Sequence, residues 1–325
     1  MNLEAASALA VELSHSSSDK DPVDLFSIQF DVNNSDVKPL LKIAMHDLVH
    51  TSSSERWTGI QRNYDWPQWY LFQSRDYLFA RIPASLTRSQ PLDKATQTSY
   101  LAMFECMQKL GYPHLCRTWN YFPDITKASR QAHNRYQLFC TGRSRAYQIF
   151  EPAHSQYPAA TVVGSQDTDL CIYFIASKQP GHAIENSKQV SAYNYPKQYS
   201  EDPPLFSRAL IHETSAQTIL FISGTASIRG HASQHSNDIQ QQTAVCLDNI
   251  ETLIETANHS HGLNAGGLAE LTMLKVYIKR PEDYSTVKTL IASSCSPQPP
   301  VSYLHGDLCR DDLLVEIEAV LIKKR

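Results

Sequence analysis

Two glutamates near the C-terminus have the spacing of an acid–base pair. Asp312–Ile322 reads as a strand, and within it Glu316 and Glu318 lie two positions apart. Because alternate side chains of a strand share a face, the two carboxyls are expected roughly 6–7 Å from each other. A solvated strand face is the ordinary interpretation, but Leu314 and Val320 lie on the same face and argue against full exposure. A carboxylic acid kept protonated there by burial and by its neighbour could act as a general acid.

Other patterns that could carry chemistry are weaker. His231 and His235 have the i, i+4 spacing of metal ligands, but neither an HExxH context nor a third ligand accompanies them, so no metal site is expected. The sequence contains no GxSxG, Walker or GxGxxG pattern, and its cysteines offer no convincing Cys–His pair. Serine hydrolases, nucleotide triphosphatases and dinucleotide-binding enzymes therefore lack support.

The elements that must position the glutamates belong to an internal repeat. The first copy is expected to contain a strand at Tyr77–Ile82, a helix at Lys94–Leu110, and strands at His114–Phe122 and Asp169–Ala176. The second is expected to contain a strand at Ile219–Ile222, a helix at Asp238–Thr256, and strands at Leu274–Ile278 and Asp312–Ile322. Phe79 and Phe221 are 142 residues apart, and so are Pro158 and Pro300. One unit is therefore expected to be a strand–helix–strand–helix–strand α+β module.

The composition excludes several classes of protein. The net charge of −4 comes with no basic stripe, so nucleic acid is not expected as a partner. No run of about 18 apolar residues is present, so no membrane span is expected. The seven cysteines are odd in number and form no CxxC motif, which favours a reduced, cytoplasmic protein over a disulfide framework.

The second copy resembles the RidA/YjgF ligand-binding modules. This resemblance is carried by Phe221–Thr225, Gln240–Thr256, Val276–Lys279 and Leu314–Ala319. Further motifs resemble one related family, the chorismatases, at Asn134–Arg143, Gln189–Pro196, Phe206–Ala209 and Gly306–Arg310. RidA proteins are trimers with sites between subunits, and chorismatases resemble one chain that contains such a trimer as pseudo-threefold domains. The resemblance covers roughly residues 60 to 325.

The resemblance implies an α+β fold of RidA/YjgF-like modules arranged with pseudo-threefold symmetry in one chain. We expect an N-terminal arm and a degenerate domain over 1–68, a central domain over 69–210 and a C-terminal domain over 211–325. The ligand cleft is expected between the last two domains. Leu25–Val32 is expected to add a strand to the degenerate domain. A monomer or weak homo-oligomer that acts on a small molecule is expected.

The implied activity is cleavage of the enol ether of chorismate, which releases pyruvate. Alignment to RidA places the catalytic acid at Glu316, which would protonate the terminal methylene carbon and create an oxocarbenium ion. Attack by water or by the ring hydroxyl then expels pyruvate, and no metal or organic cofactor is needed. The product is expected to be 3-hydroxybenzoate, with 4-hydroxybenzoate as a minor alternative.

Chorismate carries two carboxylates, which guanidinium groups bind well because they are planar and stay charged. Motif position assigns this role to Arg208 and to Arg143, which is expected in a Thr-Gly-Arg turn, although both could be ordinary surface arginines. Tyr195 and Tyr199 lie in a Tyr-x-Tyr-Pro-x-x-Tyr segment that starts at Tyr193. They could reach a ligand carboxylate or pack at the domain junction.

Gly224 and Cys309 complete the predicted site. Gly224 follows Ser223 at the expected end of a strand, where the missing Cβ would let a ligand approach backbone N–H groups, unless the glycine only forms a bend. A cysteine at position 309 together with this glycine resembles the 3-hydroxybenzoate-forming type of chorismatase. Simple packing of the thiol is the alternative.

Two other functions compete with this one. A RidA-type imine or enamine hydrolase binds its substrate's carboxylate with an arginine about fifteen residues before the catalytic glutamate, and that position is Val301 here. This departure counts against an imine hydrolase. The second competitor is a non-catalytic module that binds a small metabolite, which pyruvate release from chorismate would distinguish.

Overall fold

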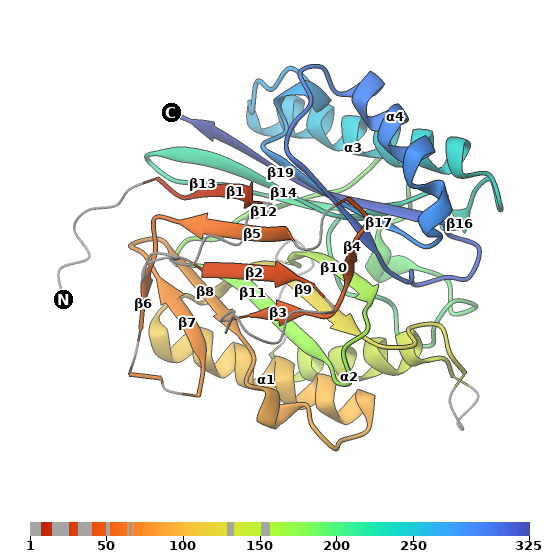
Figure 1. The fold of residues 1–325 in the computed structure, drawn as a ribbon. Helices are drawn as coiled ribbons and strands as arrows, with labels where there is room; N and C mark the ends of the chain where they lie inside the picture. Colours follow the sequence, from red (N-terminus) through yellow and green to blue (C-terminus); the bar gives the residue numbers. More distant parts are fainter. Residues whose placement is uncertain are drawn as a thin grey trace.

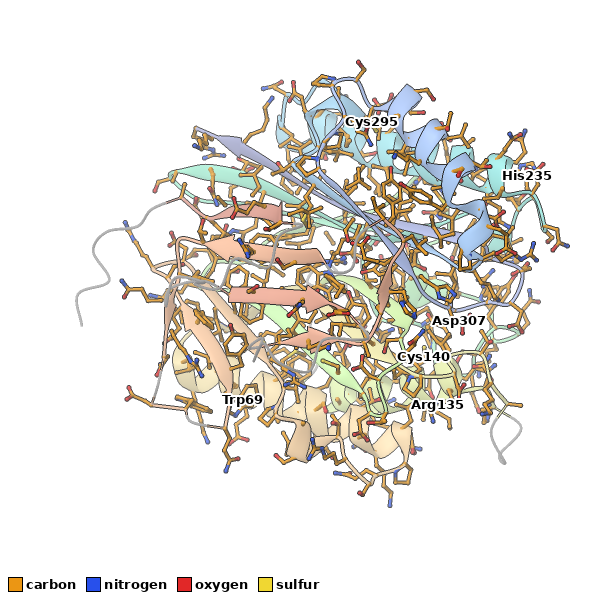
Figure 2. All side chains as sticks on the ribbon, in the orientation of Figure 1. Trp69, Arg135, Cys140, His235, Cys295 and Asp307 are labelled. Carbon is orange, nitrogen blue, oxygen red and sulfur yellow. The ribbon has the colours of Figure 1, made fainter. Side chains whose placement is uncertain are left out.

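The computed structural model describes residues 8–14, 26–31, 41–49, 53–63, 65–66, 68–128, 133–150 and 157–325, so most of the expected N-terminal arm lies outside the described residues. In the described residues, three β-sheets of four or more strands surround one shared apolar core, and two layers of helices cover the outside (Figure 1). Side chains fill the interior between the sheets (Figure 2).

The central module is a six-stranded sheet covered by two helices. In spatial order its strands are β10 (Ala159–Gly164), β9 (His114–Phe122), β11 (Cys171–Ser177), β8 (Tyr77–Arg81), β7 (Tyr70–Gln73) and β6 (Gln61–Arg62). The helices are α1 (Leu92–Leu110) and α2 (Arg135–Phe150). Their apolar faces pack with the outer face of the sheet into a core of their own.

The C-terminal module is a seven-stranded sheet covered by two further helices. In spatial order its strands are β4 (His46–Asp47), β18 (Val301–His305), β17 (Met273–Ile278), β19 (Val315–Lys324), β14 (Gln217–Ala226), β13 (Ala209–Glu213) and β12 (His182–Ile184). The helices are α3 (Ile239–His261) and α4 (Tyr284–Ser294).

Short elements in the chain are η1 (Ala84–Leu86), η3 (Ala192–Asn194), β15 (Ile228–Arg229), β16 (Ala232–Ser233), η4 (Leu268–Glu270) and η5 (Pro281–Asp283).

The two modules have the same topology, which confirms the predicted repeat. Reading from β10 and from β18, the six corresponding strands follow one order in both sheets. In each sheet the first two strands, β10 with β9 and β18 with β17, pair in parallel, and the next pairs are antiparallel. The seventh strand of the C-terminal sheet, β4, comes from the N-terminal part of the chain.

The third sheet has the same inner pattern on a smaller scale. It consists of β3 (Lys42–Ile43), β2 (Phe26–Phe30), β5 (Ser53–Thr58) and β1 (Ala10–Ser14). Its pairings are parallel, antiparallel and antiparallel in that order, as in the four strands that start from β10 and from β18 in the other two sheets. The strand expected within Leu25–Val32 is confirmed as β2. The α+β, pseudo-threefold architecture is therefore present, with a reduced N-terminal member.

Two helices differ from the expectation for identifiable reasons. The helix expected to end at Thr256 continues as α3 to His261, because the chain leaves the helix only at Gly262, whose φ of +62° suits glycine. The turn expected around Arg143 was wrong, since this residue lies inside α2. Gly142 suggested a turn, but its role is contact: a Cβ there would lie 2.1 Å from the backbone oxygen of Asp93 on α1.

None of the helices in the described part of the chain is long and apolar enough to cross a membrane. All seven cysteines are free thiols, and six of them are buried.

Candidate active site

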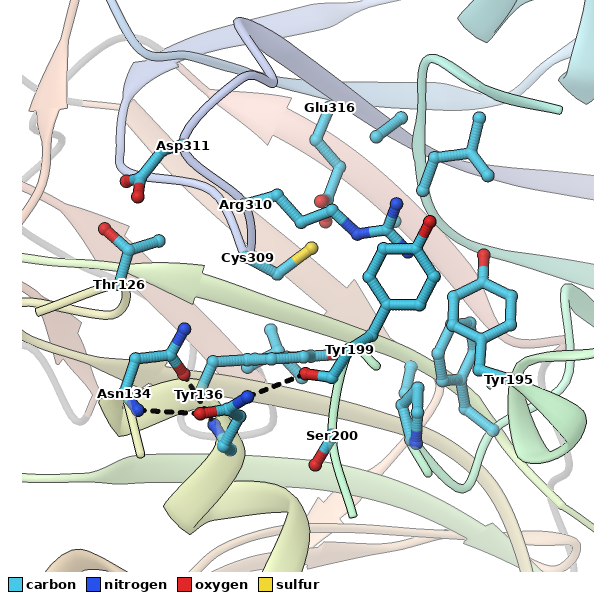
Figure 3. A pocket seen from close by; sticks show the side chains of 18 of the residues that line it. Thr126, Asn134, Tyr136, Tyr195, Tyr199, Ser200, Cys309, Arg310, Asp311 and Glu316 are labelled. Atoms are coloured by element: carbon cyan, nitrogen blue, oxygen red, sulfur yellow. Dashed lines mark hydrogen bonds between the residues drawn. The ribbon is translucent and has the colours of Figure 1, made fainter. Parts of the chain in front are cut away.

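A cavity of about 300 Å³ lies between the central and C-terminal modules, where the ligand cleft was expected. Its size suits a small molecule. Six of the seven predicted site residues line it, namely Glu316, Cys309, Arg208, Tyr195, Tyr199 and Gly224. Figure 3 shows the labelled side chains around this space. The seventh predicted residue, Arg143, is not part of the lining.

Glu316 reaches the cavity because successive side chains of β19 point to opposite faces of the sheet. Val315 and Ile317 point into the core beneath α3 and α4, so Glu316 and Glu318 point to the opposite face, as the sequence predicted. The side chain of Glu316 is only 5% exposed. Burial, followed by the charge of Glu318, raises the pKa of Glu316 to about 8. This carboxyl therefore keeps its proton at neutral pH.

Glu318 is held as a carboxylate by a set of buried donors. Its oxygens lie 2.7 Å from Lys275 Nζ and 3.0 Å from an Arg117 guanidinium nitrogen, and they accept a hydrogen bond of 2.7 Å from Trp119 Nε1. Burial opposes ionisation, but Lys275 and then Arg117 outweigh it and hold the pKa of Glu318 below its ordinary value. The pKa values of two neighbouring carboxyls on one strand are thus shifted in opposite directions, so that Glu316 is held as the acid and Glu318 as the carboxylate.

A β-bulge in β14 makes room for the acid. The pairing of β14 with β19 shifts register between Ile222 and Thr225, so one extra residue is accommodated around Gly224. A Cβ on Gly224 would lie 2.0 Å from Glu316 Oε1. The Gly224 N–H donates to Thr161 Oγ1 on β10 at 3.1 Å, and Thr161 in turn donates to Glu318. Gly224 is therefore needed for the position of Glu316, a different reason from the predicted approach of a ligand to the backbone.

Among the described residues, two guanidinium groups face the cavity. Arg208 donates 2.7 Å to Tyr195 Oη and 2.8 Å to the Val190 carbonyl, while its Nε makes no hydrogen bond in the described part of the chain. The guanidinium of Arg310 lies 3.9 Å from the centre of the Tyr199 ring and donates to the His231 carbonyl at 2.9 Å. These hydrogen bonds of both cations go to neutral groups, although the carboxyl of Glu185 also lies close to Arg208. Planar guanidinium groups held in this way suit a bound carboxylate.

The start of α2 fixes the tyrosine segment against the cavity. Asn134 and Gln137 cap the helix reciprocally: the Gln137 N–H donates to Asn134 Oδ1 at 2.9 Å, and the Asn134 N–H donates to Gln137 Oε1 at 2.8 Å. The amide of Gln137 also donates to the Tyr199 carbonyl at 2.8 Å. Dashed lines in Figure 3 mark hydrogen bonds at the labelled Asn134 and Tyr199. The helix cap therefore holds Tyr199, and through it the stacked Arg310, at the edge of the cavity.

Comparison with known sequences shows which proteins this chain is similar to. The family model described as "Chorismatase FkbO/Hyg5-like, N-terminal" matches residues 57–176. A 3-hydroxybenzoate synthase of Streptomyces hygroscopicus is 39% identical over 70% of this chain and 69% of its own. A chorismatase of Streptomyces rapamycinicus is 38% identical over 76% of this chain and 75% of its own.

The chain belongs to the chorismatase family. The fold agrees, because a crystal structure of a chorismatase superposes with a TM-score of 0.84, covering 97% of this chain and 98% of that one at 29% identity. The family resemblance stated from the Gly306–Arg310 and Asn134–Arg143 motifs is therefore confirmed.

The predicted carboxylate anchor Arg143 lies behind the chorismatase cavity rather than on its wall. It is 1% exposed, and its guanidinium is 4.9 Å from the centre of the Phe139 ring. Tyr100 and Cys140 lie close enough to interact electrostatically with its guanidinium. Arg143 is one of the largest fully buried side chains, and its three guanidinium nitrogens make no hydrogen bond to the described residues; substrate binding by Arg143 stays a prediction.

Cys309 lines the cavity beside the acid. Burial, followed by the charge of Glu316, raises the pKa of the Cys309 thiol to about 12, so it is present as a neutral S–H group at physiological pH. A thiolate base is thereby disfavoured, and the group can act only by contact or by a weak hydrogen bond.

Sequence reasoning missed Arg310, although it directly follows Cys309 in a motif that carried the family resemblance. The signal available was the Cys-Arg pair itself, which places both side chains at one bend before β19. Tyr136 and Ala160 also line the cavity and were missed. Such residue types carry no signal of their own, since tyrosine and alanine are ordinary packing residues.

Proposed function

We propose that this protein cleaves chorismate to pyruvate and 3-hydroxybenzoate. One observation carries the proposal: Glu316, a buried carboxylic acid with its pKa raised to about 8, lines a cavity that also holds two guanidinium groups. Protonation of an enol ether carbon requires an acid that still has its proton at working pH. Recognition of chorismate requires cations for two carboxylates, and Arg208 and Arg310 supply two.

In this mechanism the proton of Glu316 passes to the terminal methylene carbon of the enolpyruvyl group. The C=C bond becomes a methyl group, and the cation left behind is stabilised by its ether oxygen and by the new Glu316 carboxylate. Water or the neighbouring ring hydroxyl attacks this cation, and pyruvate leaves. If water attacked, the diene-diol left behind loses one water to become aromatic. If the ring hydroxyl attacked, no water was added, and the ring becomes aromatic by losing a proton from carbon. By either route one chorismate gives one pyruvate and one hydroxybenzoate with no redox partner.

Glu318 serves the proposed reaction without exchanging protons. Its ion pairs with Lys275 and Arg117 keep it charged, so its field disfavours loss of the proton from Glu316 before substrate binds. The same field then favours the developing positive charge of the oxocarbenium ion.

The proposed product follows from two observations. The Streptomyces hygroscopicus relative at 39% identity is a 3-hydroxybenzoate synthase. In this chain Cys309 places a neutral thiol beside Glu316, where it can contact the ring during aromatisation. We assign 3-hydroxybenzoate as the main product on this basis, with 4-hydroxybenzoate as the minor one.

Free thiols throughout the chain support action in a reducing compartment such as the cytoplasm. The single chain supplies both walls of the cavity, which supports action as a monomer or in a weak homo-oligomer.

The test is to incubate the purified protein with chorismate and to follow pyruvate with a lactate dehydrogenase-coupled assay, with the aromatic product identified by chromatography. Glu316→Gln keeps the shape of the side chain but cannot donate the proton, so turnover should fall by roughly 10²–10⁴, while the affinity for a substrate analogue changes little. Near-normal turnover of the variant would assign the proton donor elsewhere and would contradict the proposal.

A further inference from the structure

A buried lysine joins the N-terminal sheet to the carboxylate beside the catalytic acid. Lys275 Nζ lies 2.6 Å from Glu55 Oε2 and 2.7 Å from Glu318 Oε1, and all three side chains are almost fully buried. Trp57 Nε1 donates to the second oxygen of Glu55 at 2.5 Å. Glu55 is thus fixed in place although it is remote in sequence from every residue of the cavity.

The two acids come from corresponding strands of two modules. Glu318 lies on β19, and Glu55 lies on β5, which holds the same place in the N-terminal sheet as β19 does in the C-terminal sheet. Arg117 on β9 of the central sheet completes the group. All three sheets therefore contribute one or more charges where they meet.

These four charges balance. Glu55 and Glu318 carry two negative charges, and Lys275 and Arg117 carry two positive ones. In an interior with little water, a change of one charge is screened far less than at the surface. Loss of the Glu55 charge would leave one excess positive charge next to the neutral Glu316, which would favour its carboxylate form.

We propose that Glu55 is a positioning residue for the proton donor: by sharing Lys275 with Glu318 it keeps the charge beside Glu316 balanced, so that the reduced N-terminal module completes the active site. This inference rests on the proposed function of Glu316 as the acid. The N-terminal sheet would then have a role in the reaction in addition to covering one side of the core.

Other charged or titratable groups also face Glu316 or its cavity. In the described part of the chain they are Glu318 on its own strand, Arg117 on β9, Cys246 on α3, Tyr136 on α2, Tyr195, Tyr199 and Arg208 before β13, and Cys309, Arg310 and Asp311 in the segment before β19. All of these remain unchanged when Glu55 is substituted, so a shift in the behaviour of Glu316 reports on the Glu55–Lys275 pair.

The test compares the dependence of pyruvate release on pH in three variants. Glu55→Gln should move the alkaline limb of the kcat profile down by about one pH unit, so that activity above the limb falls about tenfold. Lys275→Met removes a positive charge and should move the limb up. The double variant Glu55→Gln/Lys275→Met is balanced again and should return the limb close to that of the wild type, with KM little changed in all three.

Glu12→Gln is the matched control, because Glu12 is an exposed carboxyl on β1 of the same sheet. Its limb should coincide with that of the wild type. A purely structural role of Glu55 would lower activity at every pH without moving the limb, and that result would overturn the proposal. If Glu55→Gln does not fold, Lys275→Met and the double variant carry the test together, because the limb should rise in the first and return in the second. The same limb in both variants would be equally contrary to the proposal.

A failure of the proposed function looks different from a failure of this inference. If the wild type released no pyruvate from chorismate at any pH, the function would be wrong. If the wild type were active with an alkaline limb that none of the charge variants moved, the function would stand and the role of Glu55 would be refuted.

Discussion

Glu316→Gln should stabilise the fold while it lowers the turnover of the proposed reaction by roughly 10²–10⁴. The pKa of Glu316 is raised from 4.5 to about 8 in the folded chain, mainly by burial and then by Glu318. Below pH 4.5 the carboxyl is protonated in both states and costs nothing. As the pH rises from 4.5 to 8, only the unfolded chain loses the proton, so the wild type loses stability that a permanently neutral glutamine retains.

The size of the effect follows from the two pKa values. A pH of 7 is about 2.5 units above the pKa of the carboxyl in the unfolded chain. At about 1.4 kcal/mol per unit, the free energy of unfolding of the variant should exceed that of the wild type by about 3 kcal/mol. For a chain of this length, that corresponds to a rise of about 4 °C in the unfolding midpoint. Thermal unfolding of both proteins should be measured at half-unit steps from pH 4 to pH 8.5.

The result that would refute this reasoning concerns how the stability difference between the two proteins changes with pH. The difference between variant and wild type should be near zero at pH 4 and should grow steadily toward pH 8. A constant difference across this range would mean that the Glu316 pKa is not raised in the fold. Glu255→Gln, which removes an exposed carboxyl on α3, controls for the loss of one overall charge and should show no such growth.

Three further substitutions test the rest of the site. Gly224→Ala introduces a Cβ that would lie 2.0 Å from Glu316 Oε1, so kcat should fall at least tenfold with KM little changed, and unchanged kcat would mean that the acid has freedom to move. Cys309→Ala should shift the product toward the dihydroxycyclohexadiene carboxylate without stopping pyruvate release; an unchanged chromatogram would leave Cys309 as a packing residue. Arg310→Met should raise KM for chorismate roughly 10–100-fold with a smaller effect on kcat, and equal KM values would leave Arg208 as the main anion-binding residue.

The parts of the site that could be predicted from the sequence depend on local pattern. The alternation along β19 sets Glu316 and Glu318 on one face whatever the tertiary context, and β19 was recognised from its apolar residues. The repeat was visible because Phe79 and Phe221 head copies with equal spacing, and the matching strand orders confirm it. Motif resemblance supplied the remaining cavity residues that were anticipated.

The parts that could not be predicted depend on contacts between distant segments. Gly142 indicated a turn because the contact that requires a glycine, with Asp93 on α1, is 49 positions away in the sequence. Glu55 and Lys275 carry no local signal either, since charged residues on strands are usually exposed. Only the closure of three sheets around one core shows that these two side chains form a buried ion pair.

The source of the hydrogen in the pyruvate methyl group tests the central claim most directly. Chorismate should be turned over in D₂O with lactate dehydrogenase present, so that pyruvate is trapped at once as lactate, whose methyl group is analysed by mass spectrometry. Unlabelled pyruvate carried through the same trapping step controls for exchange. Because the acidic proton of Glu316 exchanges with solvent between turnovers, the account predicts one deuterium in the methyl group of each lactate. A methyl group without deuterium would show that the hydrogen came from the substrate's own ring, and protonation by Glu316 would be excluded.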